Sequence, residues 1–86
     1  MKPSVTIDVE VSQLVNQVIR HRRIAMGLSQ QQFADICGVQ RSYVCDVERG
    51  ARCISLNSLM RFAKGLGMKP SQLVHTAESS MVEQSG

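Results

Sequence analysis

The strongest constraint on the fold is a set of four glycines, each of which follows a segment with the apolar spacing of a helix: Gly27, Gly38, Gly50 and Gly67. Glycine is common just beyond the end of a helix. The segments between these glycines leave room only for short helices, and none is long enough to span a membrane. The chain of 86 residues is therefore expected to form one small domain of short helices joined by tight turns.

Apolar residues at helical spacing predict five helices. Ser29 and Ser55 are expected N-caps, and Gln32, three residues after Ser29, completes a capping box. Pro70 stands in the first turn of the last helix, where no backbone N–H is needed. The fold class is therefore all-α, a compact bundle of about five helices in a domain of residues 12–76. The predicted helices cover residues 12–26, 29–37, 40–49, 55–66 and 71–76.

The two ends of the chain are less regular. Residues 1–11 contain the segment VTIDVEV, whose alternation of apolar and polar side chains is typical of a strand. No second strand candidate is available to pair with it, and a lone strand is unstable. The segment is expected to be a loose arm or an extension of the first helix, with pairing to its copy in a dimer as the alternative. Residues 77–86 are polar and are expected to form a frayed C-terminal tail.

Positive charge is concentrated on the predicted domain. Nine Lys or Arg side chains against three acids give residues 13–70 a charge of +6, whereas the flanking segments are acidic. A basic folded part favours a polyanionic partner, and nucleic acid is expected rather than a membrane. Because the sequence shows neither a membrane span nor a signal peptide, the protein is predicted to be cytoplasmic.

No residue pattern indicates catalysis or a cofactor. His21 and His75 lie far apart and belong to no recognisable motif, and there is no glycine-rich loop of the kind that holds phosphate. The three cysteines are odd in number and spaced by eight residues, which is neither a disulfide framework nor a zinc pattern. The sequence therefore predicts a binding protein rather than an enzyme, with no catalytic residue, metal or cofactor.

The second and third predicted helices, joined by a short glycine turn, have the proportions of a helix-turn-helix. Ala34 is small enough for a tight crossing of the two helices, and Gly38 permits the turn. Val44 and Val47 are spaced to fix one side of the third helix to the core. The other side would then project, and a projecting helix fits a DNA major groove about 12 Å wide.

Two stretches carry a resemblance to a known family. The sequence RRIAMGLSQQQFADICGVQRSYVCDVERG, followed by ISLNSLMRFAKGLGMKP, resembles the lambda-repressor/Cro-like helix-turn-helix family over about residues 13–75. Within it, RSYVCDVERGARCISL is most similar to the small controller proteins of restriction–modification systems. The resemblance implies a lambda-repressor-like domain that binds a pseudo-palindromic, double-stranded DNA operator as a homodimer and regulates transcription. An antitoxin that binds both a toxin and its own operator is the alternative.

The resemblance also implies roles for individual residues. Arg41 matches a base-reading position, where an arginine can donate two hydrogen bonds to guanine, although it could also be a solvated surface side chain. Asp46 could accept a hydrogen bond from cytosine or simply pair with Arg49. The implied base-reading residues are Gln40, Arg41, Ser42, Asp46 and Arg52, and the implied phosphate-binding residues are Ser29, Gln30, Tyr43, Arg49 and Asn57.

Two further sets concern stability and assembly. Arg23 and Glu48 match an internal ion pair of the family, which joins the first helix to the end of the third. Dimerisation in the family uses the last helix and the loop before it; the alternative is that these side chains only complete the core. A protein partner, such as a toxin or a polymerase, is also compatible with this fold. The implied dimer residues are Leu66, Met68, Leu73 and Val74.

Overall fold

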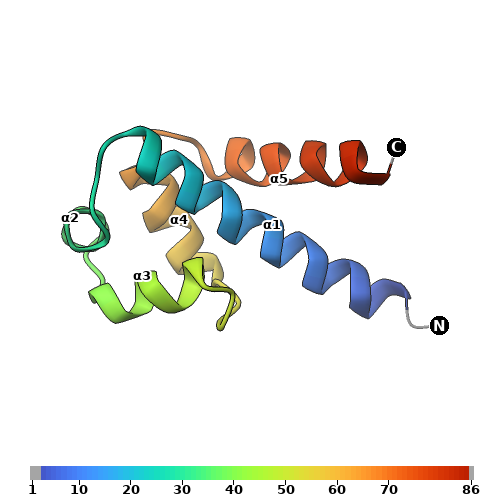
Figure 1. Ribbon diagram of the computed structural model, residues 1–86, viewed down its shortest axis with the longest axis horizontal. Coiled ribbons are helices and arrows are strands. Elements are labelled where there is room, and N and C mark those ends of the chain that lie inside the picture. Colours follow the sequence, from blue (N-terminus) through green and yellow to red (C-terminus); the bar gives the residue numbers. More distant parts are fainter. Residues whose placement is uncertain (1–2, 86) are drawn as a thin grey trace.

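The computed structural model describes the backbone of residues 3–85 and the side chains of residues 12–79. Within these residues the helices are α1 (Pro3–Ala25), α2 (Gln30–Cys37), α3 (Arg41–Glu48), α4 (Leu56–Gly65) and α5 (Pro70–Ser85). No strand occurs in this part of the chain, and the predicted all-α class is confirmed. The long helices α1 and α5 pack together and extend toward the side where both termini lie, while α2, α3 and α4 gather at the other end (Figure 1).

Side-chain caps begin α2 and α4 where the sequence predicts them. The hydroxyl of Ser29 accepts from the N–H of Gln32 at 3.0 Å, and Oε1 of Gln32 accepts from the N–H of Ser29 at 2.8 Å, which is the predicted capping box. At α4 the hydroxyl of Ser55 accepts from the N–H of Ser58 at 3.2 Å. Each cap satisfies a backbone donor that the helix leaves unpaired, and contributes roughly 1 kcal/mol.

Both long helices run beyond residues 12–26 and 71–76, and for α1 this is the helix extension that was one of the expectations for residues 1–11. Helix α1 begins at Pro3, so residues 5–11 lie in a helix and not in a strand, while their side chains lie outside the described residues. Helix α5 continues to Ser85, so the predicted end at Thr76 is wrong. Residues 77–85 contain neither glycine nor proline, and Ala77 is buried in the core, so nothing local ends the helix there.

One hydrophobic core is built from all five helices. At its centre the rings of Phe33 and Phe62 meet edge to face, with centroids 5.1 Å apart. Val44 and Val47 are both 0% exposed, so the inner side of α3 is fixed to this core. Burying a side chain of this size stabilises the folded state by about 1.5–3 kcal/mol. The other fully buried large side chains are Ile19, Leu66 and Leu73.

Helix α4 crosses α2 closely at Gly65, a contact that helical spacing alone does not predict. A Cβ atom at position 65 would lie 2.8 Å from Sγ of Cys37, and 3.3 Å from carbon atoms of both Ile36 and Phe33. The first of these distances is shorter than van der Waals contact. The two helices can therefore approach this closely only because residue 65 has no side chain.

Candidate nucleic-acid interface

The corner between α2 and α3 depends on Gly38. Its φ angle is +73°, in the left-handed region that other residues rarely adopt. The N–H of Val39 donates to the carbonyl of Ala34 at 3.0 Å and closes the turn. From α4, NH1 of Arg61 donates to the carbonyl of Gly38 at 3.2 Å. Arg61 was not among the predicted residues, because this contact depends on where α4 passes the turn and leaves no signal in the spacing.

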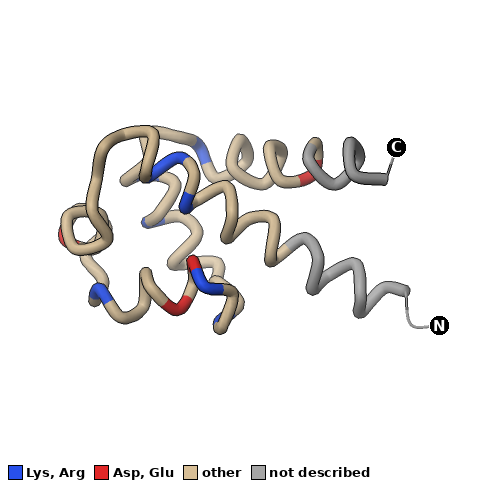
Figure 2. Tube along the Cα trace, in the orientation of Figure 1, with Lys and Arg blue, Asp and Glu red and all other residues tan. Residues whose placement is uncertain are grey.

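The outer side of α3 carries the predicted base-reading side chains. Gln40, Arg41 and Ser42 are exposed at its amino-terminal end, ahead of the buried Val44 and Val47. Figure 2 shows basic positions at both ends of α3 and acidic positions between them. Within the described residues Arg41 takes part in no ion pair. Its guanidinium is therefore available to a ligand outside the chain.

Asp46 and Arg49 pair with each other near the end of α3. NH2 of Arg49 donates to Oδ1 of Asp46 at 2.6 Å, and the arginine side chain is 65% exposed. The hydrogen bond to Asp46 and the negative charge of its carboxylate raise the pKa of Arg49 above its ordinary value. Of the two roles that the sequence left open for Asp46, pairing with Arg49 is the one present in the protein without DNA.

Tyr43 and Arg52 also lie against each other. Tyr43 is half-buried, and its ring meets that of Phe62 edge to face at 5.9 Å. The guanidinium carbon of Arg52 lies 5.4 Å from the centroid of the Tyr43 ring, within range of a cation–π interaction. Asn57, in the first turn of α4, is exposed. The loop after α3 thus presents an arginine, and the start of α4 presents an amide.

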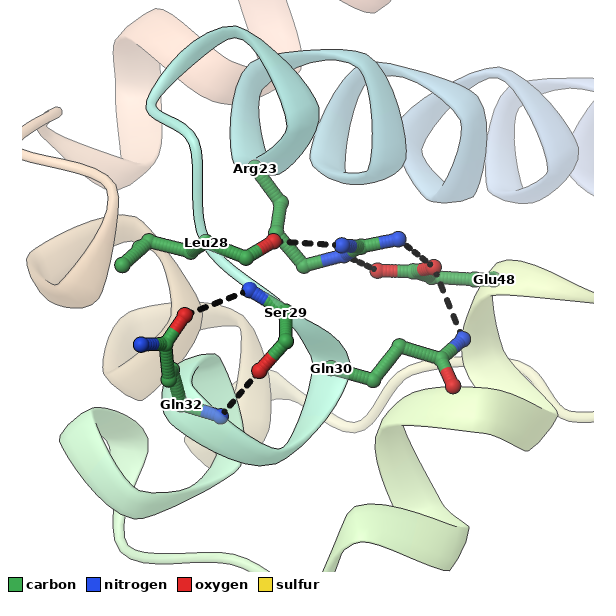
Figure 3. Close-up of polar contacts among 6 residues, drawn as sticks. All are labelled: Arg23, Leu28, Ser29, Gln30, Gln32 and Glu48. Carbon is green, nitrogen blue, oxygen red and sulfur yellow. Dashed lines mark hydrogen bonds and ion pairs between the residues drawn. The ribbon is translucent and has the colours of Figure 1, made fainter.

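A polar network ties the start of α2 to α1 and α3 (Figure 3). Arg23 pairs with Glu48 through two hydrogen bonds and also donates from NH1 to the carbonyl of Leu28 at 2.6 Å. Nε2 of Gln30 donates to Oε1 of Glu48 at 3.2 Å. Gln30 and the exposed Ser29 stand side by side at the amino end of α2, where backbone N–H groups favour an anion. The network therefore fixes the orientation of one of the two side chains predicted to bind phosphate there.

The four residues predicted for a dimer interface do not share one environment. Leu66 and Leu73 are both 0% exposed within a single chain, so they belong to the core, which was the alternative for this set. Met68 and Val74 are only half-buried. They line an open hollow of about 840 Å³ together with Arg22. Of these four residues, Met68 and Val74 are thus the two that a second chain could contact.

One buried polar residue, Asn16, was not predicted from the sequence. Asn16 is 3% exposed in α1, and its Oδ1 atom has no hydrogen-bond partner among the described residues. It faces a small cavity of about 180 Å³ between α1 and the end of α3, which is also lined by Glu48 and Arg49. The sequence does not indicate that Asn16 is buried, because an asparagine among glutamines on a helix is ordinarily expected at the solvated surface.

The fold and the exposed outer side of α3 define the class of the molecule, a DNA-binding transcription regulator of the helix-turn-helix type. A family model described as helix-turn-helix matches residues 19–73, and the chain belongs to this family. The resemblance to lambda-repressor/Cro-like proteins that the sequence indicated is thereby confirmed. In the described residues, none of the helices combines the length and the apolar character needed to cross a bilayer.

Several relatives of the chain are control proteins. The chain is 33% identical over 72 residues to control protein C.BamHI of Bacillus amyloliquefaciens, covering 83% of this chain and 89% of that protein. It is 32% identical over 66 residues to control protein C.SmaI of Serratia marcescens, covering 77% and 79% respectively. The crystal structure of the restriction-modification controller protein C.AhdI from Aeromonas hydrophila superposes with a TM-score of 0.67 and 40% identity. That match covers 73% of this chain and 94% of the other.

Proposed function

We propose that this protein regulates transcription as a homodimer on a pseudo-palindromic operator, as a controller of a restriction–modification system. One observation carries the proposal: α3 buries Val44 and Val47 completely while its amino-terminal end exposes Gln40, Arg41 and Ser42. A helix held from behind in this way can enter a major groove without disturbing the core. The similarity to controller proteins over most of the chain supports the choice of regulator.

Base reading is assigned to the outer side of α3 and to Arg52. Arg41 can donate two hydrogen bonds to O6 and N7 of guanine, which discriminates by about 1–3 kcal/mol against another base. Gln40 and Ser42 are the neighbours of Arg41 in the chain, and their polar side chains are shorter than that of Arg41. Arg52 approaches from the following loop. Asp46 would act here mainly through Arg49, since the two side chains are paired at 2.6 Å.

Phosphate contacts are assigned to the rim around α3. Ser29 and Gln30 occupy the amino end of α2, where the helix dipole and unpaired N–H groups attract an anion. Arg49, at the end of α3, and Asn57, in the first turn of α4, are both exposed. Such contacts set the orientation of the protein and make the affinity fall steeply with salt concentration.

The dimer is assigned to the hollow between the end of α1 and α5. Met68 and Val74 are half-buried apolar side chains there, and burial against a second copy would remove them from water. Two copies of α3 would then lie about 34 Å apart, one turn of DNA. Sedimentation equilibrium of the wild type and of Val74→Lys tests this contact, with a shift toward monomer expected for the variant.

Selection of bound sequences from random duplexes tests the function itself. The wild type should select a pseudo-palindrome, and Arg41→Ala should lose the preference at one base in each half-site. Lys64→Ala is the matched control, because it removes an exposed cation from α4 rather than from α3. A wild type that enriches no sequence would reject the proposed function, and an unchanged preference in Arg41→Ala would reject Arg41 as a reader.

A further inference from the structure

Tyr43 connects the hydrophobic core to Arg52 through a chain of aromatic contacts. Phe33 and Phe62, both fully buried, meet edge to face with centroids 5.1 Å apart. Phe62 in turn meets Tyr43 with centroids 5.9 Å apart and an interplanar angle of 72°. The Arg52 guanidinium carbon lies 5.4 Å from the Tyr43 centroid. A ring anchored in the core therefore contacts a cation on the surface.

The backbone after α3 brings Arg52 to this ring. Gly50 has a φ angle of +81°, which only glycine adopts readily. The N–H of Gly50 donates to the carbonyl of Val47 at 3.1 Å, and the N–H of Ala51 donates to the carbonyl of Asp46 at 2.9 Å. These two bonds reverse the chain at the end of α3. Arg52 follows at once, and its side chain reaches back to the first turn of the helix that the chain has just left.

We propose that Tyr43 is a positioning residue, whose ring holds the Arg52 guanidinium ready to read a base before DNA is bound. The inference rests on the proposed function and deepens it, because it concerns how one reading side chain of that interface is held. It gives the ring of Tyr43 a role distinct from a phosphate contact by its hydroxyl group.

The physical reason is the freedom of an exposed arginine. A guanidinium on a loop samples many rotamers, and binding DNA must immobilise it. An aromatic ring within about 6 Å attracts the cation, and Phe serves in place of Tyr because the attraction comes from the ring. Tyr43 is itself restrained by Phe62, so the ordering of Arg52 is partly complete in the free protein. Loss of the ring should weaken discrimination at the Arg52 base by about two- to fivefold.

The free protein gives the first test. In proton NMR spectra, the δ-methylene and Nε–H protons of Arg52 should be shifted upfield by the ring current of Tyr43. The upfield shift should persist in Tyr43→Phe and disappear in Tyr43→Leu. Arg41, which has no ring contact among the described residues, serves as the internal reference. Equal Arg52 shifts in the wild type and Tyr43→Leu would overturn the inference.

Selection from random duplexes gives the second test. Arg52→Ala identifies the base that depends on Arg52. Tyr43→Leu should weaken preference at that base by about two- to fivefold and leave the Arg41 base unchanged. Tyr43→Phe should keep the preference at both bases, whatever its overall affinity. Thermal unfolding of each variant accompanies these measurements, since Tyr43 also packs on Phe62.

The remaining outcomes separate the inference from the function. Equal losses at the Arg41 and Arg52 bases in Tyr43→Leu would mean general unpacking and would overturn the inference. The same is true if Tyr43→Phe loses the Arg52 preference as fully as Tyr43→Leu, because the hydroxyl would then be responsible. If Arg52→Ala changes no base preference while the wild type still selects an operator, the inference fails and the proposed function stands. If the wild type selects no sequence, the proposed function fails as well.

Discussion

Nε of Arg23 lies 2.6 Å from Oε2 of Glu48, and NH2 of the same guanidinium lies 2.9 Å from Oε1. The two groups thus form a bidentate pair, the stronger kind of charged hydrogen bond. The side chains are only 10% and 2% exposed. The pair joins α1 to the last residue of α3, and Glu48 also holds the amide of Gln30. It therefore links the stability of the bundle to the placement of the DNA-binding helix.

Removing one partner of this pair should destabilise the protein strongly. Glu48→Ala leaves the Arg23 guanidinium buried without its carboxylate, and we expect a loss of about 3–5 kcal/mol in the free energy of unfolding. The matched control is Asp46→Ala, two residues earlier on α3, whose pair with Arg49 has the same 2.6 Å separation but is exposed. The control should lose less than about 1 kcal/mol. Equal losses in urea unfolding would contradict the structural role of the buried pair.

The helix-turn-helix could be predicted because its signals are local. A serine cap at position 29, a glycine at position 38 and two valines three residues apart each act within one or two turns of the chain. Of the network around Glu48, only the pair with Arg23 could be predicted. The contact between Gln30 and Glu48 could not, because it depends on where three helices meet. Leu66 and Leu73 show the same limit: apolar residues at helical spacing suit a core and an interface equally, and only burial distinguishes them.

The crossing at Gly65 should not tolerate a methyl group. Alanine is a better helix former than glycine by about 1 kcal/mol, but its Cβ would lie 2.8 Å from Sγ of Cys37. Overpacking of a core contact usually destabilises by about 1–3 kcal/mol. Because the gain in helix propensity offsets part of that cost, we expect a net loss of up to about 2 kcal/mol for Gly65→Ala.

A second substitution tests whether the thiol causes that loss. Cys37→Ala removes the Sγ atom that the new methyl group would meet. The double variant Gly65→Ala with Cys37→Ala should lose less free energy of unfolding than the two single variants lose in total. The reason is that the new methyl group then no longer meets Sγ. Strict additivity in denaturant unfolding would show that the strain lies elsewhere.

The thiol of Cys37 should make stability depend on pH in the alkaline range. Burial raises the pKa of Cys37 from the ordinary 9.0 to about 11 in the folded protein. The unfolded chain releases the thiol proton first, so this contribution is complete below pH 9 and is lost as the pH rises through 11. The loss in the free energy of unfolding should reach about 2–3 kcal/mol.

Two cysteine variants isolate this effect from other groups that titrate at high pH. All three cysteines are free thiols; Cys37 is buried, whereas Cys53 is exposed. Thermal or urea unfolding between pH 8 and 11 should show a shallower decline for Cys37→Ala than for the wild type, and an unchanged decline for Cys53→Ala. A decline of the same steepness in Cys37→Ala and wild type would exclude Cys37 as the cause.

The pair of Asp46 and Arg49 should restrain general affinity for DNA. Asp46→Asn removes a negative charge from α3 and releases the Arg49 guanidinium, which lies 2.6 Å from it. We expect tighter binding to every duplex, and a slope of log affinity against log salt that is steeper by about one. Base preference should not change, because Asp46 is occupied by Arg49.

Asp35→Asn is the matched control for this measurement. Asp35 is also exposed and is held by a glutamine, since Nε2 of Gln31 donates to its Oδ1 at 2.9 Å on α2. The same change in net charge at Asp35 should alter the salt slope by much less, because no arginine is released. Titrations of specific and random duplexes at several salt concentrations compare the two variants. A changed preference at a single base pair in Asp46→Asn, with an unaltered salt slope, would instead make Asp46 a direct reader of DNA, accepting from cytosine N4.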